Sequence, residues 1–233
     1  MLRTQMNSIR PFLLSLFAVS CLSLSLGARP ADPTKKEGSN SLAMPMQCRP
    51  GKTSTEAIGW RWKPDARVRI YYLKNNFSLT ERAAFSRAIE NWNRALSEID
   101  SRIVLTIVGE REAVADDDAT VTVLRGIPKG KDRLGQLRIY SMSNGVMRAT
   151  MIISPDVTDL NALTSLMAHE IGHSLGLADC YECRRGTTAM AAFKEKNKGN
   201  DVYQPSDCDK YVVASGYAKD LSEQGRDIPT AKK

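Results

Sequence analysis

The chain is poor in histidine: it has only two among 233 residues, and both lie within residues 169–179. A metal site that needs three imidazoles is therefore excluded. Aromatic residues are also scarce, at 6% of the chain, and none interleaves the basic runs KEKNKG (194–199) and TAKK (230–233). Because binding of single-stranded nucleic acid uses aromatic platforms beside the cations, we expect no nucleic-acid partner and interpret these runs as solvated surface.

Long hydrophobic runs are absent from the sequence except near its beginning. Residues 11–26 (PFLLSLFAVSCLSLSL) carry no charge, follow two arginines and precede the small residues Gly27 and Ala28. This order predicts a cleaved secretory signal peptide over residues 1–28 and hence a secreted or periplasmic protein. The run is too short and serine-rich for a stable membrane span. The alternative is a lipid anchor through Cys21, although the apolar run continues past this residue.

Removal of the signal peptide leaves 205 of the 233 residues, which suits one domain with its own core. The formal charge falls from +7 to +5, since 31 of the 33 basic residues remain against 26 acidic ones. Four of the five cysteines also remain, namely Cys48, Cys180, Cys183 and Cys208. An even number of cysteines in an exported protein predicts disulfides, for which three pairings are possible.

Composition divides the rest of the chain into three parts. Residues 29–59 are rich in Pro, Lys, Ser and Gly and have no apolar period, which predicts a linker or a short pro-segment. Order is expected to begin near Trp60, with one domain over residues 60–213. Residues 214–233 are predicted to form a polar C-terminal tail.

Strand patterns occur at five places in this domain. Residues 67–72 alternate between polar and apolar side chains, as in a strand with one buried face. The other four are β-branched or apolar runs, at 103–108, 119–124, 137–142 and 146–154. The last two flank Asn144-Gly145, a hairpin signal that predicts an antiparallel pair.

Two helices are expected among these strands. The pattern S-x-x-E at 78–81, followed by one apolar stripe, predicts a capped helix over residues 79–99. Thr158 or Asp159 can cap a second helix over residues 160–175. This order of elements predicts an α+β domain with a mixed sheet, two main helices and an irregular C-terminal lobe.

The second predicted helix leads into the stretch HEIGHSLGLAD (169–179). His169 and His173 are four residues apart, so on a helix their imidazoles project from one face and can share a metal ion. Glu170 lies beside such an ion, where its carboxylate can take a proton from a bound water. Neutral imidazoles suit zinc, but a catalytic zinc usually has three protein ligands and one open position.

Two residues can supply the third ligand. One is Glu195, if a later helix carries it, although the surrounding KEKNKGN has no apolar face with which a helix could pack. The other is Asp179, which comes six residues after His173. Gly176 lies between them and allows the chain to leave the helix and fold back.

At these residues the sequence resembles the metzincin clan of zinc endopeptidases, whose pattern is HExxHxxGxx followed by His or Asp. HEIGHSLGL is particularly similar to the helices of matrixins. The resemblance implies a Zn²⁺ ion held by His169, His173 and Asp179, and Glu170 as the general base of peptide-bond hydrolysis. It also implies a methionine in a tight turn beneath the ion, and the run TTAM makes Met190 the candidate.

The resemblance extends over residues 67–190 and is specific over the zinc helix. It implies a twisted mixed sheet whose edge strand, near residues 134–140, binds an extended peptide or protein substrate by strand addition. The clan's pattern is not matched everywhere, because Asp179 replaces the matrixin histidine and Ala192 replaces an astacin-like tyrosine. The aspartate adds negative charge to the site, so we expect modest activity. No histidine is left for a structural zinc, and we expect a monomer.

Cys48 has two interpretations. It lies in MQCRPG, near where matrixin pro-segments place a cysteine that ligates zinc and blocks the site, but the letters do not match that family's PRCGxPD closely. We favour a disulfide between Cys48 and Cys208, with Cys180 bonded to Cys183.

The sequence therefore predicts a secreted zinc-dependent endopeptidase. The alternative function is a secreted binding protein that keeps the fold without turnover. Glu170 argues against this alternative, because a structural metal site has no use for a carboxylate beside an open coordination position.

Overall fold

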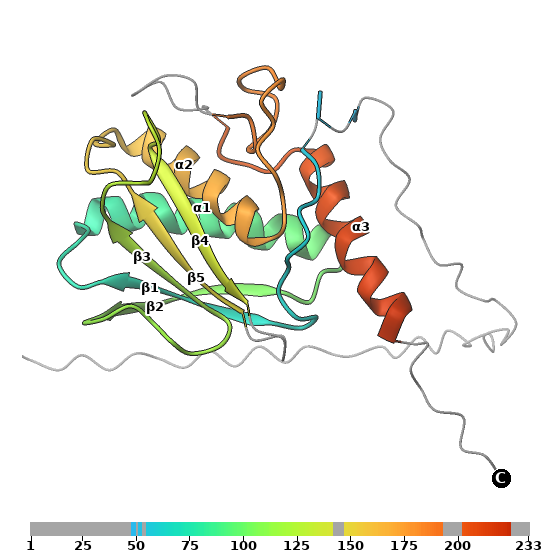
Figure 1. The fold of residues 1–233 in the computed structure, drawn as a ribbon, viewed down its shortest axis with the longest axis horizontal. Helices are drawn as coiled ribbons and strands as arrows, with labels where there is room; N and C mark the ends of the chain where they lie inside the picture. Colours follow the sequence, from blue (N-terminus) through green and yellow to red (C-terminus); the bar gives the residue numbers. More distant parts are fainter. Residues whose placement is uncertain (1–47, 50, 53–54, 142–146, 193–201, 225–233) are drawn as a thin grey trace, which may run out of the picture. The chain divides into compact units, whose positions relative to one another are not determined.

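The structure is a computed structural model that describes residues 48–49, 51–52, 55–141, 147–192 and 202–224, with side chains as far as Tyr217. Its elements are, in chain order, β1 (Arg67–Leu73), α1 (Leu79–Glu98), β2 (Val104–Arg111), β3 (Thr120–Arg125), β4 (Gly135–Ser141), β5 (Met147–Ile153), α2 (Leu160–Ser174) and α3 (Asp207–Gln224) (Figure 1). The predicted hairpin turn, the signal peptide and Glu195 lie outside the described residues.

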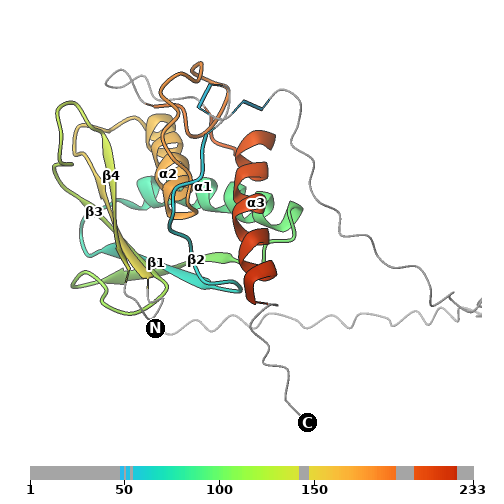
Figure 2. The ribbon, with the colours of Figure 1, turned by 45° about the vertical axis from the view of Figure 1, so that its right-hand side comes forward.

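The five strands form one sheet in the order β2-β1-β3-β5-β4. β1 pairs in parallel with β2 and β3, and β3 pairs in parallel with β5, whereas β4 is antiparallel to β5. α1 and α2 lie on the same face of this sheet, α1 toward β2 and α2 toward β4 (Figures 1 and 2). The predicted α+β class with a mixed sheet is confirmed, and β4 is an edge strand.

The core lies between the sheet and the two helices. Val68, Ile70 and Tyr72 alternate along β1 with more exposed residues and are buried against the helices, as expected from their spacing. Trp92 of α1 is 1% exposed, and its indole N–H donates to the carbonyl of Ala168 at 2.7 Å. This bond joins α1 to the turn of α2 that immediately precedes His169.

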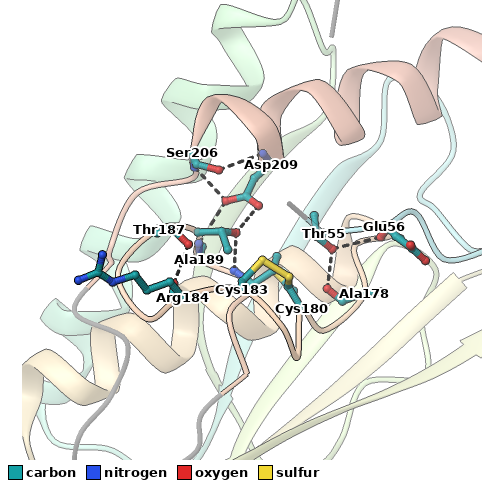
Figure 3. Close-up of a disulfide and its surroundings, with 12 residues drawn as sticks. Thr55, Glu56, Ala178, Cys180, Cys183, Arg184, Thr187, Ala189, Ser206 and Asp209 are labelled. Atoms are coloured by element: carbon teal, nitrogen blue, oxygen red, sulfur yellow. Dashed lines mark hydrogen bonds between the residues drawn. A yellow bond between two sulfur atoms is a disulfide. The ribbon is translucent and has the colours of Figure 1, made fainter. Parts of the chain in front are cut away.

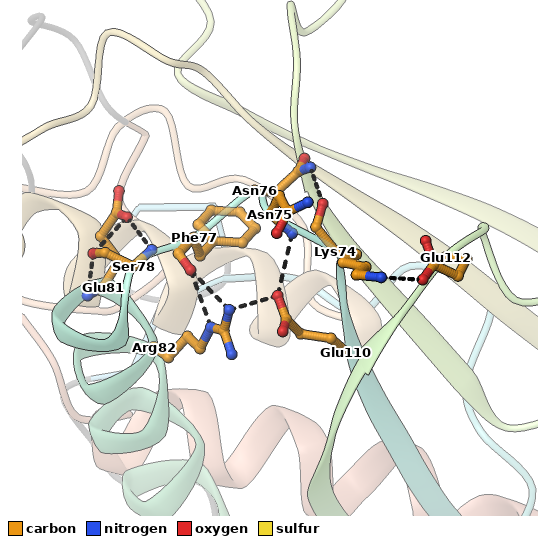
Figure 4. Close-up of polar contacts among 9 residues, drawn as sticks. All are labelled: Lys74, Asn75, Asn76, Phe77, Ser78, Glu81, Arg82, Glu110 and Glu112. Atoms are coloured by element: carbon orange, nitrogen blue, oxygen red, sulfur yellow. Dashed lines mark hydrogen bonds and ion pairs between the residues drawn. The ribbon is translucent and has the colours of Figure 1, made fainter.

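A capping box fixes the start of α1 (Figure 4). The Ser78 hydroxyl accepts from the backbone N–H of Glu81 at 3.3 Å, and the Glu81 carboxylate accepts from the backbone N–H of Ser78 at 2.7 Å. The same carboxylate pairs with Arg125 at the end of β3. The predicted cap is therefore present, and it also links α1 to the sheet.

The C-terminal part differs from the prediction, which had an irregular lobe and a polar tail from residue 214. The structure instead has α3, which continues to Gln224. Its start carries a second capping box, in which the N–H of Asp209 donates to Ser206 Oγ at 3.1 Å and the N–H of Ser206 donates to Asp209 Oδ2 at 2.9 Å. The sequence did not indicate this helix, because β-branched residues and Gly216 lower the helix propensity of the stretch.

Two disulfides are present, Cys48–Cys208 and Cys180–Cys183. They are the pairs favoured from the sequence. Because the sulfur of Cys48 is bonded to α3, it is not a metal ligand in this structure. In the described part of the chain, no helix has both the length and the apolar character that a membrane crossing requires.

Ser78→Ala should lower the free energy of unfolding by about 1 kcal/mol, because the N–H of Glu81 loses its acceptor. Urea unfolding followed by circular dichroism measures this change. Thr80→Ala is the matched control, since Thr80 is exposed in the same helical turn and should cost nothing. Equal stabilities of the two variants would contradict the capping role.

Candidate metal centre

The three predicted ligands converge beyond the end of α2. Their ligand atoms all lie within 4.8 Å of one another. His169 Nε2 is 3.0 Å from Asp179 Oδ1, and His173 Nε2 is 3.4 Å from the same oxygen. Two ligands that are each about 2.0–2.1 Å from a tetrahedral zinc ion lie about 3.3 Å apart, so this donor set fits zinc.

Backbone carbonyls orient both imidazoles toward this point. His169 Nδ1 is 2.9 Å from the carbonyl oxygen of Ala189, and His173 Nδ1 is 2.8 Å from the carbonyl oxygen of Leu177. Each Nδ1–H can therefore donate to a carbonyl, so that Nε2 of each ring faces Asp179 and can bind a metal ion once it gives up its proton. This is the arrangement by which proteins fix the tautomer of a metal-binding histidine.

The chain turns from α2 toward Asp179 at Gly176. This residue has φ +91°, a left-handed conformation that glycine adopts without strain. A Cβ at this position would also lie 2.6 Å from the carbonyl oxygen of Trp60. Backbone conformation and close approach therefore both require glycine where the sequence predicted the helix to break.

The segment predicted as a linker or pro-segment contributes to this site. Its last residues lie antiparallel to the loop that follows α2, where the N–H of Ile58 donates to the carbonyl of Gly176 at 2.7 Å. The N–H of Ala178 donates to the carbonyl of Glu56 at 2.8 Å. Sequence reasoning missed this pairing because it uses backbone groups, which leave no apolar period.

A second contact holds the other side of Asp179. The N–H of Cys180 donates to the carbonyl of Met190 at 2.8 Å, and the N–H of Ala192 donates to the carbonyl of Cys180 at 3.1 Å. The disulfide to Cys183 closes the next turn of the chain (Figure 3). The candidate third ligand thus lies between two anchored backbone segments.

Met190, the candidate for the methionine turn, lies against the part of α2 that carries the two histidines. It is fully buried. A Cβ on Gly172 would lie 2.2 Å from the Met190 sulfur and 3.2 Å from Trp92. The methionine therefore packs directly against the backbone between the two histidines.

Asp209 of α3 is a buried residue of the site that the sequence did not reveal. Its carboxylate accepts from the hydroxyl of Thr188, from the N–H of Ala189 at 3.1 Å and from the N–H of Ser206 at 2.9 Å. Burial raises its pKa, although these hydrogen bonds favour the ionised form. Asp209 thereby fixes the turn that precedes Met190. The pattern S-x-x-D at 206–209 was the one available signal.

Glu170 occupies the floor of the site. It is 3% exposed, and its Oε2 has no hydrogen-bond partner among the described residues. Burial raises its pKa, while the charges of His173 and His169 act in the opposite direction. A Cβ on Gly135 of β4 would lie 2.3 Å from Oε1, so any other residue at this position would require the carboxylate to shift. One of its oxygens therefore remains available for a proton.

In the metal-free protein the acidic side chains of the site favour the protonated form of His173. Burial alone would lower the pKa of His173, but the hydrogen bond with Asp179 and the charges of Glu170 and Asp179 raise it to about 9. Burial would raise the pKa of Asp179, but hydrogen bonds from both histidines hold it well below its usual range. The charge of Asp179 also raises the pKa of Tyr181, which therefore stays protonated.

The site opens into a pocket of about 560 Å³. The two histidines, Asp179 and Glu170 line this pocket, as do residues 134–137 at the start of β4. Ile58 and Trp60 contribute to the lining, as do the charged residues Lys131, Asp132 and Arg133. The predicted edge strand therefore borders the candidate metal centre.

No protein-family model matches the chain, and no curated protein is significantly similar to it in sequence. Among solved structures, myroilysin is similar with a TM-score of 0.39 and 12% identity, over 67% of this chain and 81% of that one. Metalloproteinase-II from Bacteroides fragilis has a TM-score of 0.42 and 15% identity, over 72% and 58% of the two chains. A chaperone–substrate complex matches with a TM-score of 0.38 and 14% identity, over 68% and 36%. Likeness at this level assigns no function.

Asp179→Ala removes a proposed zinc ligand and should weaken zinc binding by more than about 100-fold. This loss would exceed the effect of about 10–100-fold that follows when a metal ligand loses its outer hydrogen-bond partner. Competition with a chromophoric chelator measures this affinity. Asp132→Asn is the control: it removes one charge from the lining of the same pocket, and asparagine tolerates the φ of +59° found there. If Asp179→Ala retained the wild-type affinity, Asp179 would not be a ligand.

Proposed function

We propose that the protein is an exported zinc endopeptidase of the metzincin clan. The observation that carries this proposal is the constellation that lines the pocket. Two helix histidines and a loop carboxylate lie at zinc-ligand separations, and the buried Glu170 beside them has one oxygen that no group in the described part of the chain contacts by a hydrogen bond. A purely structural metal site would need only the ligands.

In this proposal His169, His173 and Asp179 hold the zinc ion. When bound, zinc polarises a water molecule and the substrate carbonyl, lowering the pKa of the water from about 15.7 toward about 7. Glu170 accepts the water proton at Oε2 and returns it to the leaving nitrogen of the peptide.

The edge strand β4 is the proposed binding surface for the peptide. Its residues from Gly135 to Ser141 pair with β5 on one side only, and its first residues line the pocket. An extended peptide can pair with the other side by strand addition, which directs its scissile carbonyl toward the site. We therefore expect the substrates to be extended peptides or unfolded segments of proteins.

Export is supported by the two disulfides and by the signal-like residues 1–28. Disulfides form and persist in oxidising compartments, which include the periplasm and the extracellular space. The lipid anchor through Cys21 is the alternative form of an exported protein.

Glu170→Gln should reduce cleavage of casein or a peptide library by about 10²–10⁴-fold, which is the usual contribution of a general base. Its zinc content should equal that of the wild type, because Glu170 is not a ligand. Glu182→Gln, an exposed carboxylate in the loop after Asp179, should keep full activity. Equal cleavage by the wild type and Glu170→Gln would overturn the general-base role. Zinc binding without any cleavage by the wild type would favour the non-catalytic binding protein.

Gly135→Ala should lower activity by displacing Glu170, although the new Cβ would also lie 2.9 Å from a methyl group of Leu166. The new Cβ would displace the carboxylate, so kcat should fall by roughly tenfold or more while zinc affinity stays unchanged. Gly59→Ala is the matched control, since a Cβ at Gly59 meets nothing within 4 Å. Steady-state kinetics and zinc titration of both variants provide the comparison. Wild-type kinetics for Gly135→Ala would show that Glu170 does not depend on this space.

A further inference from the structure

The two carboxylate oxygens of Asp179 have different neighbours. Oδ1 faces His169 Nε2 at 3.0 Å and His173 Nε2 at 3.4 Å. Oδ2 accepts a hydrogen bond from the hydroxyl of Tyr181 at 3.1 Å. One oxygen of the carboxylate thus faces the candidate metal position, and the other is hydrogen-bonded to a phenol.

Tyr181 contributes little to the packing of the protein. Its side chain is 63% exposed, and it belongs to the turn that the Cys180–Cys183 disulfide closes. Its hydroxyl nevertheless meets Asp179 at hydrogen-bond distance. An aromatic side chain that is this exposed adds little to the stability of the core, so we expect Tyr181 to act mainly through its hydrogen bond to the Asp179 carboxylate.

The backbone on both sides of Asp179 is already fixed. Before it, the carbonyl of Ala178 accepts from the hydroxyl of Thr55, as Figure 3 shows. After it, Cys180 is 1% exposed, hydrogen-bonded to the Met190 segment and bonded to Cys183. Rotation of the Asp179 carboxylate about its own side-chain bonds is the freedom that remains, and the Tyr181 hydroxyl restricts it.

We propose that Tyr181 is a positioning residue of the metal centre, which holds Oδ2 of Asp179 so that the carboxylate presents Oδ1 alone to the ion. The inference rests on the proposed zinc site and adds a residue that no motif in the sequence supplied. With Tyr181 included, each of the three ligands has an outer hydrogen-bond partner, since the two histidines already have backbone carbonyls. Loss of such partners typically weakens metal affinity by about 10–100-fold.

The test compares zinc affinity in four proteins: the wild type, Tyr181→Phe, Asp179→Ala and the double variant. Tyr181→Phe should weaken zinc binding by about 10–100-fold in the wild-type background and have no effect once Asp179 is alanine. Tyr140→Phe is the matched control, because it removes an exposed hydroxyl from β4 and should leave affinity unchanged. The thermal midpoint of metal-free Tyr181→Phe should equal that of the wild type.

Cobalt substitution gives a second readout, because the visible absorption of Co²⁺ reports its ligand geometry. The spectrum of Tyr181→Phe should differ from that of the wild type, and that of Tyr140→Phe should not. Wild-type zinc affinity in Tyr181→Phe, or an equal loss with and without Asp179, would overturn the positioning role. Absence of zinc binding in the wild type itself would instead overturn the proposed function, so the two failures are distinguishable.

Discussion

The shared contact of Asp179 Oδ1 with the two imidazoles is the interaction on which the rest of the site depends. With only two histidines in the chain, the third ligand of a zinc site must come from another residue type. A carboxylate from a loop is harder to fix than a second helical imidazole, because a loop has no internal hydrogen-bond ladder. Here the loop backbone is fixed by hydrogen bonds on both sides of Asp179, to the segment before β1 and to the chain around Met190.

The need to hold these side chains in fixed positions also explains why glycines occur around the centre. Gly176 lets the chain turn with a positive φ while the backbone of Trp60 passes close by. Because Gly172 has no side chain, the Met190 sulfur can pack against α2. The lack of a side chain at Gly135 likewise leaves room for Glu170 beside β4. At each of these positions a single methyl group would collide with an atom that defines the site. Close packing at these positions therefore adds to the hydrogen bonds of the loop in holding the candidate base and ligands in register.

Local features of the fold were predictable, whereas long-range features were not. The ends of α1 and α2 follow from capping residues and apolar stripes, which act within a few residues of the chain. The spacing of His169 and His173 similarly predicted that their imidazoles would share one face, whereas spacing left Asp179 and Glu195 open and only the metzincin resemblance favoured Asp179, whose carboxylate the structure brings to the two imidazoles. The sequence did not predict the pairing of the segment before β1 with the loop after α2, or the bond from Asp209 to the methionine turn. The first depends on backbone groups that any residue possesses, and the second joins a side chain to a turn 20 residues away in the sequence, so in both cases the tertiary fold sets the partners.

Zinc K-edge X-ray absorption of the purified wild-type protein, loaded with one equivalent of zinc, tests the central claim most directly. The zinc ion should have four light-atom ligands at about 2.0–2.1 Å, with multiple-scattering features from two imidazoles and oxygen as the remaining ligands. Sulfur scattering at about 2.3 Å, or a shell without imidazole features, would contradict it.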